Sequence, residues 1–370
     1  MGQLRSIQMP SGFLPQCRSS GIEEWEEPWL PFTRWDDKTS LCAKWTLMDY
    51  IRLALRLAFL GSFRLIVLTI CAFCFFSSFF LFTISASTPS PFQTISPWRR
   101  RLLLFGSRCL GGIFFWAWGF EIRVKKSAPI SAGVIVCNHI SYIDFMILFL
   151  VLDGPSFVGK KEMVQLPLTK RVGDWGQCLY VDRDREKSAQ SDSMHVPSLA
   201  SASTSTSVGA SSGSIASGIT LRQQLHAAAR AEGKVSLPPL VIFPEGTTTN
   251  GSAILTFKSG AFQSSYPVQP VTIAYHSAWW NPSFESIWKW RHLLYSLTCP
   301  KTVVVIHILP VLKATAKEAR NPSLFAEHAR RVIASDLQLP LVEMNLRDKQ
   351  EYHRRLIRRF QQGKNASCNL

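Results

Sequence analysis

Residues 65–84 form a run of twenty residues without a charged side chain, and no other feature constrains the fold of this chain more strongly. The run reads LIVLTICAFCFFSSFFLFTI. Because a helix of about 20 apolar residues crosses a hydrocarbon core of about 30 Å, the run predicts a membrane-embedded helix. Arginines bracket it, namely Arg52, Arg56 and Arg64 before it and Arg99, Arg100 and Arg101 after it. They are expected to face lipid head groups, but with both flanks basic they indicate no orientation.

A second apolar stretch, residues 102–120, is rich in glycine and aromatic residues and carries Arg108 near its start. Two interpretations are open. The stretch is either a buried helix of the domain that follows, or the return arm of a hairpin or an in-plane anchor. We assign residues 1–50 to an N-terminal arm and residues 51–120 to a membrane-anchoring segment.

The composition narrows the class of protein. Of the 370 residues, 46% are hydrophobic, which excludes a wholly disordered chain because such chains lack the apolar surface that offsets ordering entropy. A polytopic transporter is also excluded, since it would need many apolar runs of about 20 residues. The 41 lysines and arginines exceed the 25 acidic residues by 16, which predicts an anionic partner. No zinc spacing, RNA-recognition signature or basic region with aromatic platforms is present, so we expect membrane lipids and no nucleic acid.

Beyond the anchor, short β-branched runs alternate with segments of helical length. This pattern predicts an α/β domain over residues 121–340, with a mixed sheet covered by helices. The predicted strands are residues 133–137, 156–158, 178–181, 240–243, 268–275 and 302–309. The predicted helices are residues 141–152, 221–231 and 322–337, the last with Asn321 as N-cap and Pro322 at its first position.

Two segments differ from this domain in composition. Residues 188–218 hold twelve serines in 31 positions and almost no apolar residue, which predicts a flexible surface insertion. Residues 341–370 form a basic tail. Its segment 347–364 is either a solvated terminal helix or a helix that binds anionic lipid head groups.

The first group of chemically suggestive residues is NHISYID, at residues 138–144, where a predicted strand leads into a predicted helix. Ser141 suits the N-cap and Asp144 falls at position N3, so the plain interpretation is a capped helix after a turn. If His139 lies in that turn, its ring can fold back onto Asp144. A carboxylate that orients one ring nitrogen leaves the other as a general base near neutral pH. No serine or cysteine lies nearby in a nucleophile elbow, which favours a base acting on a substrate hydroxyl over a covalent acyl-enzyme.

Three further groups of residues suit a substrate that carries phosphate. GQCLYVDR, at residues 176–183, places Arg183 at a strand end, where a guanidinium can bind a phosphate through two hydrogen bonds. FPEGTTTNG, at residues 243–251, follows a strand with a carboxylate and three threonine hydroxyls, and its Gly246 permits close approach of a ligand. VQPVTIAY, at residues 268–275, is a strand with Pro270 near its start, which by itself predicts an edge strand.

In order, spacing and sequence, these four blocks resemble those of the glycerophospholipid acyltransferase family, which includes lysophosphatidic acid and lysophosphatidylcholine acyltransferases. The resemblance covers residues 98–312, so the N-terminal arm and the tail lie outside it, as does the Ser-rich insertion. That insertion separates the second block from the third. The third block continues as Thr-Thr-Asn where the family pattern has Arg-Ser. In this it resembles the branch that uses lysophospholipids with larger head groups and some fungal lysophosphatidic acid enzymes.

The resemblance implies a reaction and a role for the first block. His139 would be the general base that takes the proton from a free glycerol hydroxyl, and Asp144 would orient it. The hydroxyl oxygen would attack the thioester carbonyl of acyl-CoA, and coenzyme A would leave. The fold implied is that of the acyltransferase domain, with acyl-CoA as co-substrate, no bound cofactor and no metal.

The resemblance also implies the residues that bind substrate. The glycerol phosphate of the acceptor would be positioned by Arg183, Glu245, Gly246 and Thr247. Pro270 would shape the wall for the acyl chain or coenzyme A. Lys160, with Lys161 beside it, would meet coenzyme A phosphates, or would belong to a solvated basic turn.

Lysophosphatidic acid is the first acceptor expected, with lysophosphatidylcholine or lysophosphatidylethanolamine as the alternative. By the same resemblance we expect the endoplasmic reticulum membrane with the site facing the cytosol, and lipid droplets if the two apolar stretches form a hairpin. An alternative of a different class is a non-catalytic lipid-binding protein with the same fold. The intact residues His139, Asp144 and Glu245 argue against it.

Overall fold

The computed structural model describes residues 29–34, 46–83, 88–160, 167–181, 215–234, 237–277, 280–284 and 286–368. Most of the predicted Ser-rich insertion lies outside the described residues, and so does Arg183. The last residues of the predicted insertion, from Ile215, form the start of helix α8 (Ile215–Ala231).

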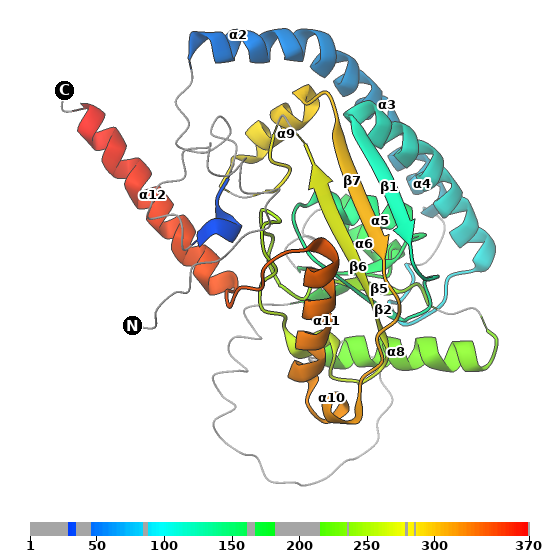
Figure 1. Cartoon of the computed structure of the whole chain (residues 1–370). Helices are drawn as coiled ribbons and strands as arrows, with labels where there is room; N and C mark the ends of the chain where they lie inside the picture. Colours follow the sequence, from blue (N-terminus) through cyan, green and yellow to red (C-terminus); the bar gives the residue numbers. More distant parts are fainter. Residues whose placement is uncertain are drawn as a thin grey trace, which may run out of the picture.

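A seven-stranded mixed sheet forms the centre of the described chain, in the order β1-β7-β6-β2-β5-β3-β4 (Figure 1). Neighbouring strands are parallel except for β6 and β7, which are antiparallel. The strands are β1 (Phe120–Lys126), β2 (Val134–Cys137), β3 (Ser156–Lys160), β4 (Leu179–Val181), β5 (Leu240–Ile242), β6 (Val268–His276) and β7 (Thr302–Ile308). The prediction of a mixed sheet covered by helices is confirmed.

Strand β1 was not among the predicted strands. It lies at the end of the strand order and pairs in parallel with β7, with Ile122 opposite Val304. After Phe120 its side chains become steadily more exposed, and four of its seven residues are charged. Such a strand lacks the continuous apolar run by which the buried strands were found.

Helices cover both faces of the sheet because its strands alternate between two cores. In β2, Ile135 and Cys137 belong to one core, and Val134 and Val136 belong to the other. The first core includes residues of α4 (Pro97–Trp118), α5 (Ile143–Val151) and α9 (Lys289–Thr298), and the second includes residues of α8 and α11 (Pro322–Leu337). The carboxyl ends of β2, β5 and β6 remain at one edge, between the two helical layers.

Helix α11 agrees with its prediction in both bounds and cap. The side chain of Asn321 accepts a hydrogen bond from the Ser323 N–H, and Pro322 occupies the first turn. At its far end the Asp336 carboxylate binds His307 of β7 (2.7 Å) and accepts a hydrogen bond from Thr272 of β6 (2.7 Å). These contacts fix α11 against the sheet.

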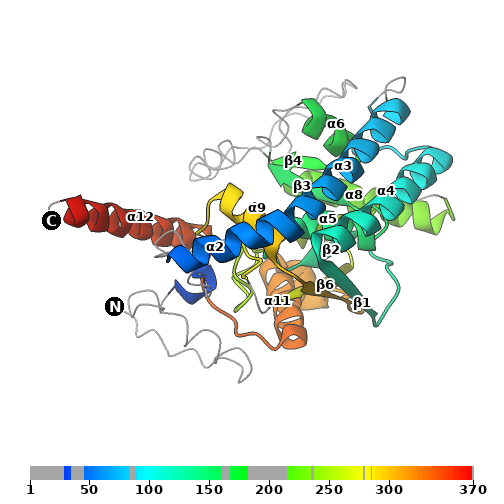
Figure 2. The same cartoon turned by 90° about the horizontal axis from the view of Figure 1, so that it is seen from above.

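The apolar run lies within a continuous helical segment, Leu47–Thr83, that is long and apolar enough to cross a membrane. It comprises α2 (Leu47–Arg56), a π-helical turn (Leu57–Gly61) and α3 (Ser62–Thr83), and many of its apolar side chains are exposed. Helix α4 packs beside α3, so the two apolar stretches form a helical hairpin against the domain (Figures 1 and 2). The C-terminal end of α4 enters the first core through Phe115 and Trp118.

Arg64 differs from its expected place among lipid head groups, because its side chain is buried against the domain. Its guanidinium donates hydrogen bonds to the backbone carbonyls of Leu297 (2.9 Å), Cys299 and Pro300 (2.9 Å). These carbonyls lie in and just after the last turn of α9, where a helix end presents acceptors that need donors. The arginine therefore joins the anchor to the domain.

The remaining elements lie around this body. They are α6 (Pro167–Trp175), a 3₁₀ turn (Ser259–Ala261), α10 (Ala316–Arg320) and α12 (Leu346–Cys368). Helix α12 begins beside the N-terminal segment 29–34 and runs outward from the domain (Figure 1). The predicted tail helix is thus present.

Candidate active site

The turn between β2 and α5 holds the NHISYID block, and its geometry differs from the predicted cap. Helix α5 begins at Ile143 with Tyr142 as N-cap, so Ser141 is not the capping residue. The Asp144 carboxylate accounts for this difference, because it accepts hydrogen bonds from the backbone N–H groups of Ile140 (2.8 Å) and Ser141 (3.0 Å). These bonds keep the residues before Tyr142 in a turn outside the helix.

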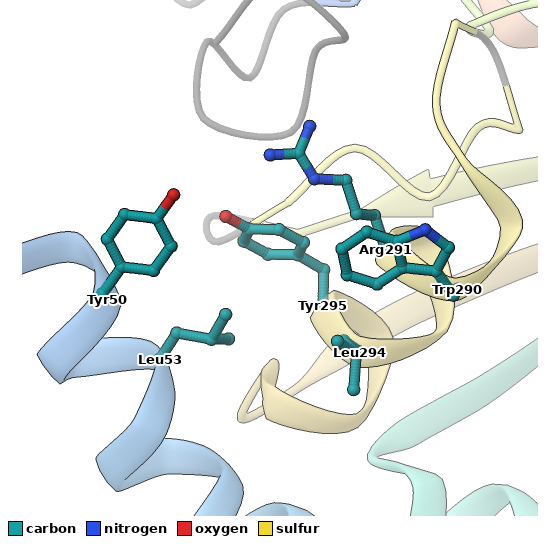
Figure 3. A pocket seen from close by; sticks show the side chains of 6 residues that line it. All are labelled: Tyr50, Leu53, Trp290, Arg291, Leu294 and Tyr295. Carbon is teal, nitrogen blue, oxygen red and sulfur yellow. The ribbon is translucent and has the colours of Figure 1, made fainter. Parts of the chain in front are cut away.

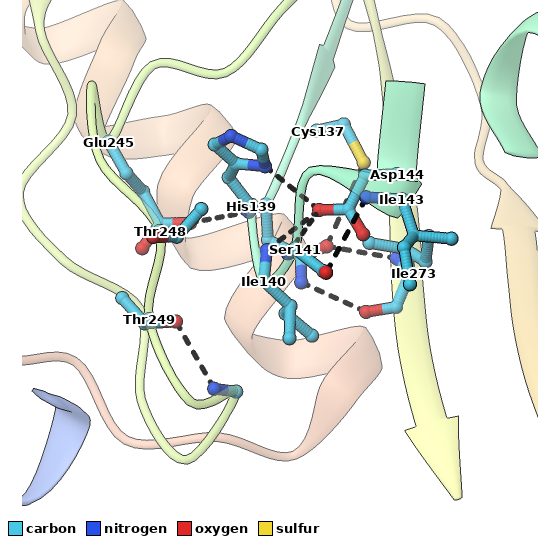
Figure 4. Close-up of polar contacts among 12 residues, drawn as sticks. Cys137, His139, Ile140, Ser141, Ile143, Asp144, Glu245, Thr248, Thr249 and Ile273 are labelled. Carbon is cyan, nitrogen blue, oxygen red and sulfur yellow. Dashed lines mark hydrogen bonds and ion pairs between the residues drawn. The ribbon is translucent and has the colours of Figure 1, made fainter. Parts of the chain in front are cut away.

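Asp144 is fully buried and its carboxylate has four hydrogen-bond donors. Besides the two backbone groups, Nδ1 of His139 lies 2.8 Å from Oδ2 (Figure 4). The hydroxyl of Tyr275 donates to Oδ1 over 2.6 Å. The structure therefore brings His139 and Asp144 together, in the arrangement that lets Asp144 fix the imidazole ring.

Tyr275 is a site residue that the sequence analysis missed, although it is the last residue of the fourth block. Burial, followed by the charge of Asp144, raises the pKa of its hydroxyl well above the usual 10. The phenol therefore keeps its proton and remains a donor to Asp144. The signal in the sequence was only its place at the end of a strand parallel to β2.

The His139 ring lies in an aromatic setting that limits its motion. It stacks on Phe243 with ring centroids 4.0 Å apart, and the edge-to-face partner Phe145 is 5.5 Å away. Because Asp144 accepts the Nδ1 proton, Nε2 is the ring nitrogen left with a lone pair. The side chain keeps 13% of its surface exposed, so the ring is not completely enclosed.

Glu245 ties the third block to the first. Its Oε1 accepts the backbone N–H of His139 (3.0 Å) and its Oε2 accepts that of Leu255 (3.1 Å). The side chain is buried, and burial raises its pKa to about 8 although both backbone N–H groups oppose the shift. In the structure Glu245 thus holds two backbone segments, and its contact with a substrate phosphate stays a prediction.

Gly246 and Thr247 form the turn after Glu245. Gly246 has a φ of +69°, and a Cβ added there would lie 2.9 Å from Cε and 3.1 Å from Nζ of Lys258. The positive φ therefore favours glycine here, whereas the contact is with the far end of the flexible Lys258 side chain, which can shift. Lys258 is a cation beside the predicted phosphate-binding turn that the sequence analysis did not single out, since it follows the block by seven residues.

Lys160 and Pro270 lie on strands that adjoin this edge. Lys160 ends β3, which runs parallel to β5, so its backbone reaches the same edge as Glu245. β4 pairs in parallel with β3 and ends at Val181, two positions before Arg183 in the sequence. Whether these cations meet a substrate stays a prediction.

The expectation that Pro270 begins an edge strand is wrong, because β6 lies between β2 and β7 in the interior of the sheet. The proline is tolerated because the side of its backbone that lacks an N–H faces the chain beyond the end of β7. On that side the Pro270 carbonyl accepts a hydrogen bond from the N–H of Leu309 (3.1 Å). The regular pairing of β6 with β7 begins one residue later, at Val271. Its predicted role in lining the acyl-chain or coenzyme A wall remains open to test.

A cavity of about 140 Å³ lies between α2 and α9, away from the predicted site residues (Figure 3). Leu53 and Leu294 form its apolar part, and the polar groups of Tyr50, Tyr295 and Arg291 lie around it. None of the predicted site residues contributes to it. The chemistry of the chain is instead concentrated at the carboxyl edge of the sheet, and no cluster of metal-ligating side chains occurs among the described residues.

Comparison with known proteins gives a family match within this region. Residues 120–274 match the family model described as Acyltransferase. A lysophospholipid acyltransferase of Arabidopsis thaliana, LPEAT1, is 28% identical over 283 residues, covering 69% of this chain and 64% of its own length. Lysophosphatidylcholine acyltransferase 2 of Rattus norvegicus is 27% identical, covering 69% of this chain and 42% of its own.

Two further comparisons extend these. A lysophosphatidylcholine acyltransferase of Drosophila melanogaster is 30% identical over 229 residues, which are 60% of this chain and 36% of its own length. The chain thus spans less than two thirds of these relatives. The solved 1-acyl-sn-glycerophosphate acyltransferase PlsC of Thermotoga maritima aligns over 77% of this chain and 96% of its own, with 17% identity and a TM-score of 0.45.

Proposed function

We propose that this chain transfers the acyl group of acyl-CoA to the free hydroxyl of a lysophospholipid, because residues 120–274 match the family model described as Acyltransferase. The observation that supports the proposal most directly is the pairing of His139 with the buried carboxylate of Asp144, at 2.8 Å. This pair lies in a turn at the carboxyl edge of parallel strands, where open α/β sheets bind their ligands.

The reaction is a direct transfer in two proton movements. Nε2 of His139 takes the hydroxyl proton as the oxygen of the lysophospholipid bonds to the thioester carbon. The carbon–sulfur bond then breaks, the new ester remains on the glycerol, and the coenzyme A thiolate takes the proton from His139. Asp144 stabilises the imidazolium between these steps, and a general base of this kind contributes about 10²- to 10⁴-fold in rate.

A covalent acyl-cysteine is disfavoured at this site. Cys137 is the thiol at the end of β2, and it is fully buried. Burial, and then the nearby carboxylates of Asp144 and Glu245, raise the pKa of its thiol well above the usual range. A thiol held protonated is a poor nucleophile, which leaves the substrate hydroxyl as the attacking group.

Residues at the same edge of the sheet are proposed to bind the substrates. Gly246 and Thr247 would receive the acceptor phosphate on their turn, with Glu245 holding that turn to His139. Arg183, Lys160 and the newly found Lys258 are the cations proposed to meet acceptor or coenzyme A phosphates. Pro270 is proposed to border the acyl chain or coenzyme A.

For the acceptor we now place lysophosphatidylcholine ahead of lysophosphatidic acid. Two of the relatives reported above are named lysophosphatidylcholine acyltransferases. The Thr-Thr-Asn continuation of the third block agrees with an acceptor that carries a larger head group. We further propose the endoplasmic reticulum membrane as the location, with the site facing the cytosol, and the α3–α4 hairpin would also suit a lipid droplet.

An acceptor panel tests the proposal. Purified protein in detergent is given labelled acyl-CoA with lysophosphatidylcholine, lysophosphatidylethanolamine or lysophosphatidic acid, and the labelled product is separated. We expect label in phosphatidylcholine above the other products. Label only in phosphatidic acid would overturn the acceptor, and label in no phospholipid would support the alternative of a non-catalytic lipid-binding protein.

A further inference from the structure

Two segments from opposite ends of the described chain, residues 29–34 and the first turns of α12, meet at one loop of the candidate active site. The loop comprises residues 244–255, which we call the acceptor loop because it contains the Gly246–Thr247 turn. The N-terminal segment 29–34 contacts it from one side, and the first turns of α12 contact it from another. Neither end lies within the residues that match the acyltransferase family.

Lys349 of α12 makes the contact from the C-terminal side. Its ammonium donates hydrogen bonds to the backbone carbonyl of Thr248 (3.0 Å) and to its hydroxyl (2.8 Å). The lysine is only 8% exposed, so these bonds are largely shielded from water. Thr248 directly follows Thr247 and is the position at which the third block departs from the Arg-Ser pattern.

Asn250 makes the contact from the N-terminal side. Its side-chain amide donates to the carbonyls of Leu30 (2.6 Å) and Thr33 (3.0 Å), and its backbone N–H donates to the carbonyl of Pro31 (2.8 Å). Three successive contacts to a six-residue segment fix the loop to that segment at a single residue.

An apolar cluster joins the two ends beneath the loop. Phe32 is fully buried. It clusters with Ala253 and Leu255 of the loop and with Tyr352 and Leu356 of α12. Arg34, also buried, binds the carbonyls of Asn281 (2.8 Å) and Ser283 (2.7 Å), so the segment is attached to the domain as well.

The acceptor loop is also hydrogen-bonded to the turn that holds His139, so a shift of the loop would reach the candidate active site. The Thr249 N–H donates to the carbonyl of His139 (2.9 Å). The Glu245 carboxylate accepts a hydrogen bond from the His139 N–H (Figure 4) and another from the Leu255 N–H, so it bridges these two residues. We propose that segment 29–34 and the first turns of α12 form a clamp that sets the position of the acceptor loop, with Lys349 as its positioning residue for the lysophospholipid acceptor. This inference rests on the proposed function.

A kinetic test uses the full chain with Lys349→Met, which removes the ammonium and keeps most of the aliphatic stem. We expect the KM for the lysophospholipid to rise about tenfold, as for the loss of hydrogen bonds from a charged donor, with the KM for acyl-CoA unchanged. Lys349→Arg should restore part of the acceptor affinity. The matched control is Lys317→Met on α10, an exposed lysine outside the site, which should behave as wild type.

The outcome separates this inference from the proposed function. If wild-type protein transfers acyl groups and Lys349→Met has the same acceptor KM, the clamp is refuted while the function stands. An equal loss for both substrates, with a lowered Tm and no rescue by Lys349→Arg, would also refute it, because it would indicate a role in stability alone.

A second measurement does not depend on activity. Amide hydrogen exchange over residues 246–255 should become faster in Lys349→Met and in Asn250→Ala than in Lys317→Met, because each substitution removes one side of the clamp. Unchanged exchange in both variants would overturn the clamp even if the wild-type protein shows no acyl transfer.

Discussion

The Asp144 carboxylate shows how single residues set the chemistry of this site. Its four donors come from the turn between β2 and α5 and from Tyr275 of β6, which is 131 positions away in the sequence. A carboxylate held on both oxygens cannot rotate away from His139 without breaking other bonds. The fixed orientation of the imidazole is therefore a property of several backbone segments together.

Removing the donor from β6 tests this interpretation. Tyr275→Phe should lower kcat by about 10- to 100-fold, since a hydrogen bond to a charged group contributes about 1.5–3 kcal/mol. The KM values should change little, because the tyrosine contacts Asp144 and is not assigned to substrate. Steady-state kinetics on purified protein provide the measurement. Tyr266→Phe, before the start of β6 at the opposite edge, is the matched control, and equal kcat for both variants would contradict the role of Tyr275.

Glu245 leads to a prediction about pH and stability. Burial raises its pKa in the folded chain from 4.5 to about 8. Between these two pH values the folded state keeps a proton on Glu245 that the unfolded state has released. The contribution of this group to stability is therefore full below about pH 4.5 and is lost as the pH rises toward 8. Glu245→Gln is neutral at every pH and lacks this dependence.

Thermal unfolding of the two proteins from pH 5 to pH 9 measures the difference. The Gln substitution lowers the free energy of unfolding by an amount that does not depend on pH. Its NH₂ group faces a backbone N–H from which the carboxyl oxygen accepted a hydrogen bond. The Tm advantage of wild type over Glu245→Gln should therefore shrink as the pH rises. Parallel Tm curves would show that Glu245 does not titrate in this range.

At the scale of elements, helix α3 is bound to the domain at both of its ends. Arg64 near its start binds carbonyls at the C-terminal end of α9. At its end, Arg171 of α6 donates from Nε to the Thr83 hydroxyl (2.8 Å). The loop that follows is also attached, because Gln177 donates to the carbonyl of Ser90 (3.2 Å). A 22-residue helix is about 33 Å long, close to the thickness of a hydrocarbon core.

Since both ends contact one domain, we predict that α3 lies along the membrane face with the domain and does not cross to the other side. An epitope inserted at Thr94, in the loop between α3 and α4, should be digested by external protease in sealed microsomes together with the acyltransferase domain. An epitope protected while the domain is digested would show instead that the hairpin spans the membrane.

Local pattern predicted most of the buried elements and few of their connections. The strand that leads to His139 and the helix that begins at Pro322 follow from short β-branched and amphipathic runs, which are local signals. Strand β1 was missed because its charged residues conceal its period. The interior position of Pro270 was also missed, because strand order depends on partners distant in the sequence.

At the scale of the whole molecule, local sequence patterns also predict few of the contacts that form the site. The first block predicted that His139 could fold back onto Asp144 if the histidine lay in the turn before the helix. Tyr275 on Asp144, Lys349 on Thr248 and the segment 29–34 on Asn250 are contacts between distant parts of the chain. No spacing in the sequence encodes them.

The excess positive charge likewise divides into different uses once the fold is known. Arg64 and Arg222 are buried and bind mainly backbone carbonyls, so they stabilise the structure. Lys349 is buried against the acceptor loop. Arginines of α12 are exposed, and the binding of anionic lipid head groups by this helix stays a prediction.

The central claim is that His139 is the general base of an acyl transfer to a lysophospholipid. The most direct test is the kcat of His139→Ala, measured as coenzyme A release from acyl-CoA in the presence of lysophosphatidylcholine. We predict a decrease of about 10²- to 10⁴-fold, with His328→Ala on α11 equal to wild type. Turnover by His139→Ala at the wild-type rate would contradict the account.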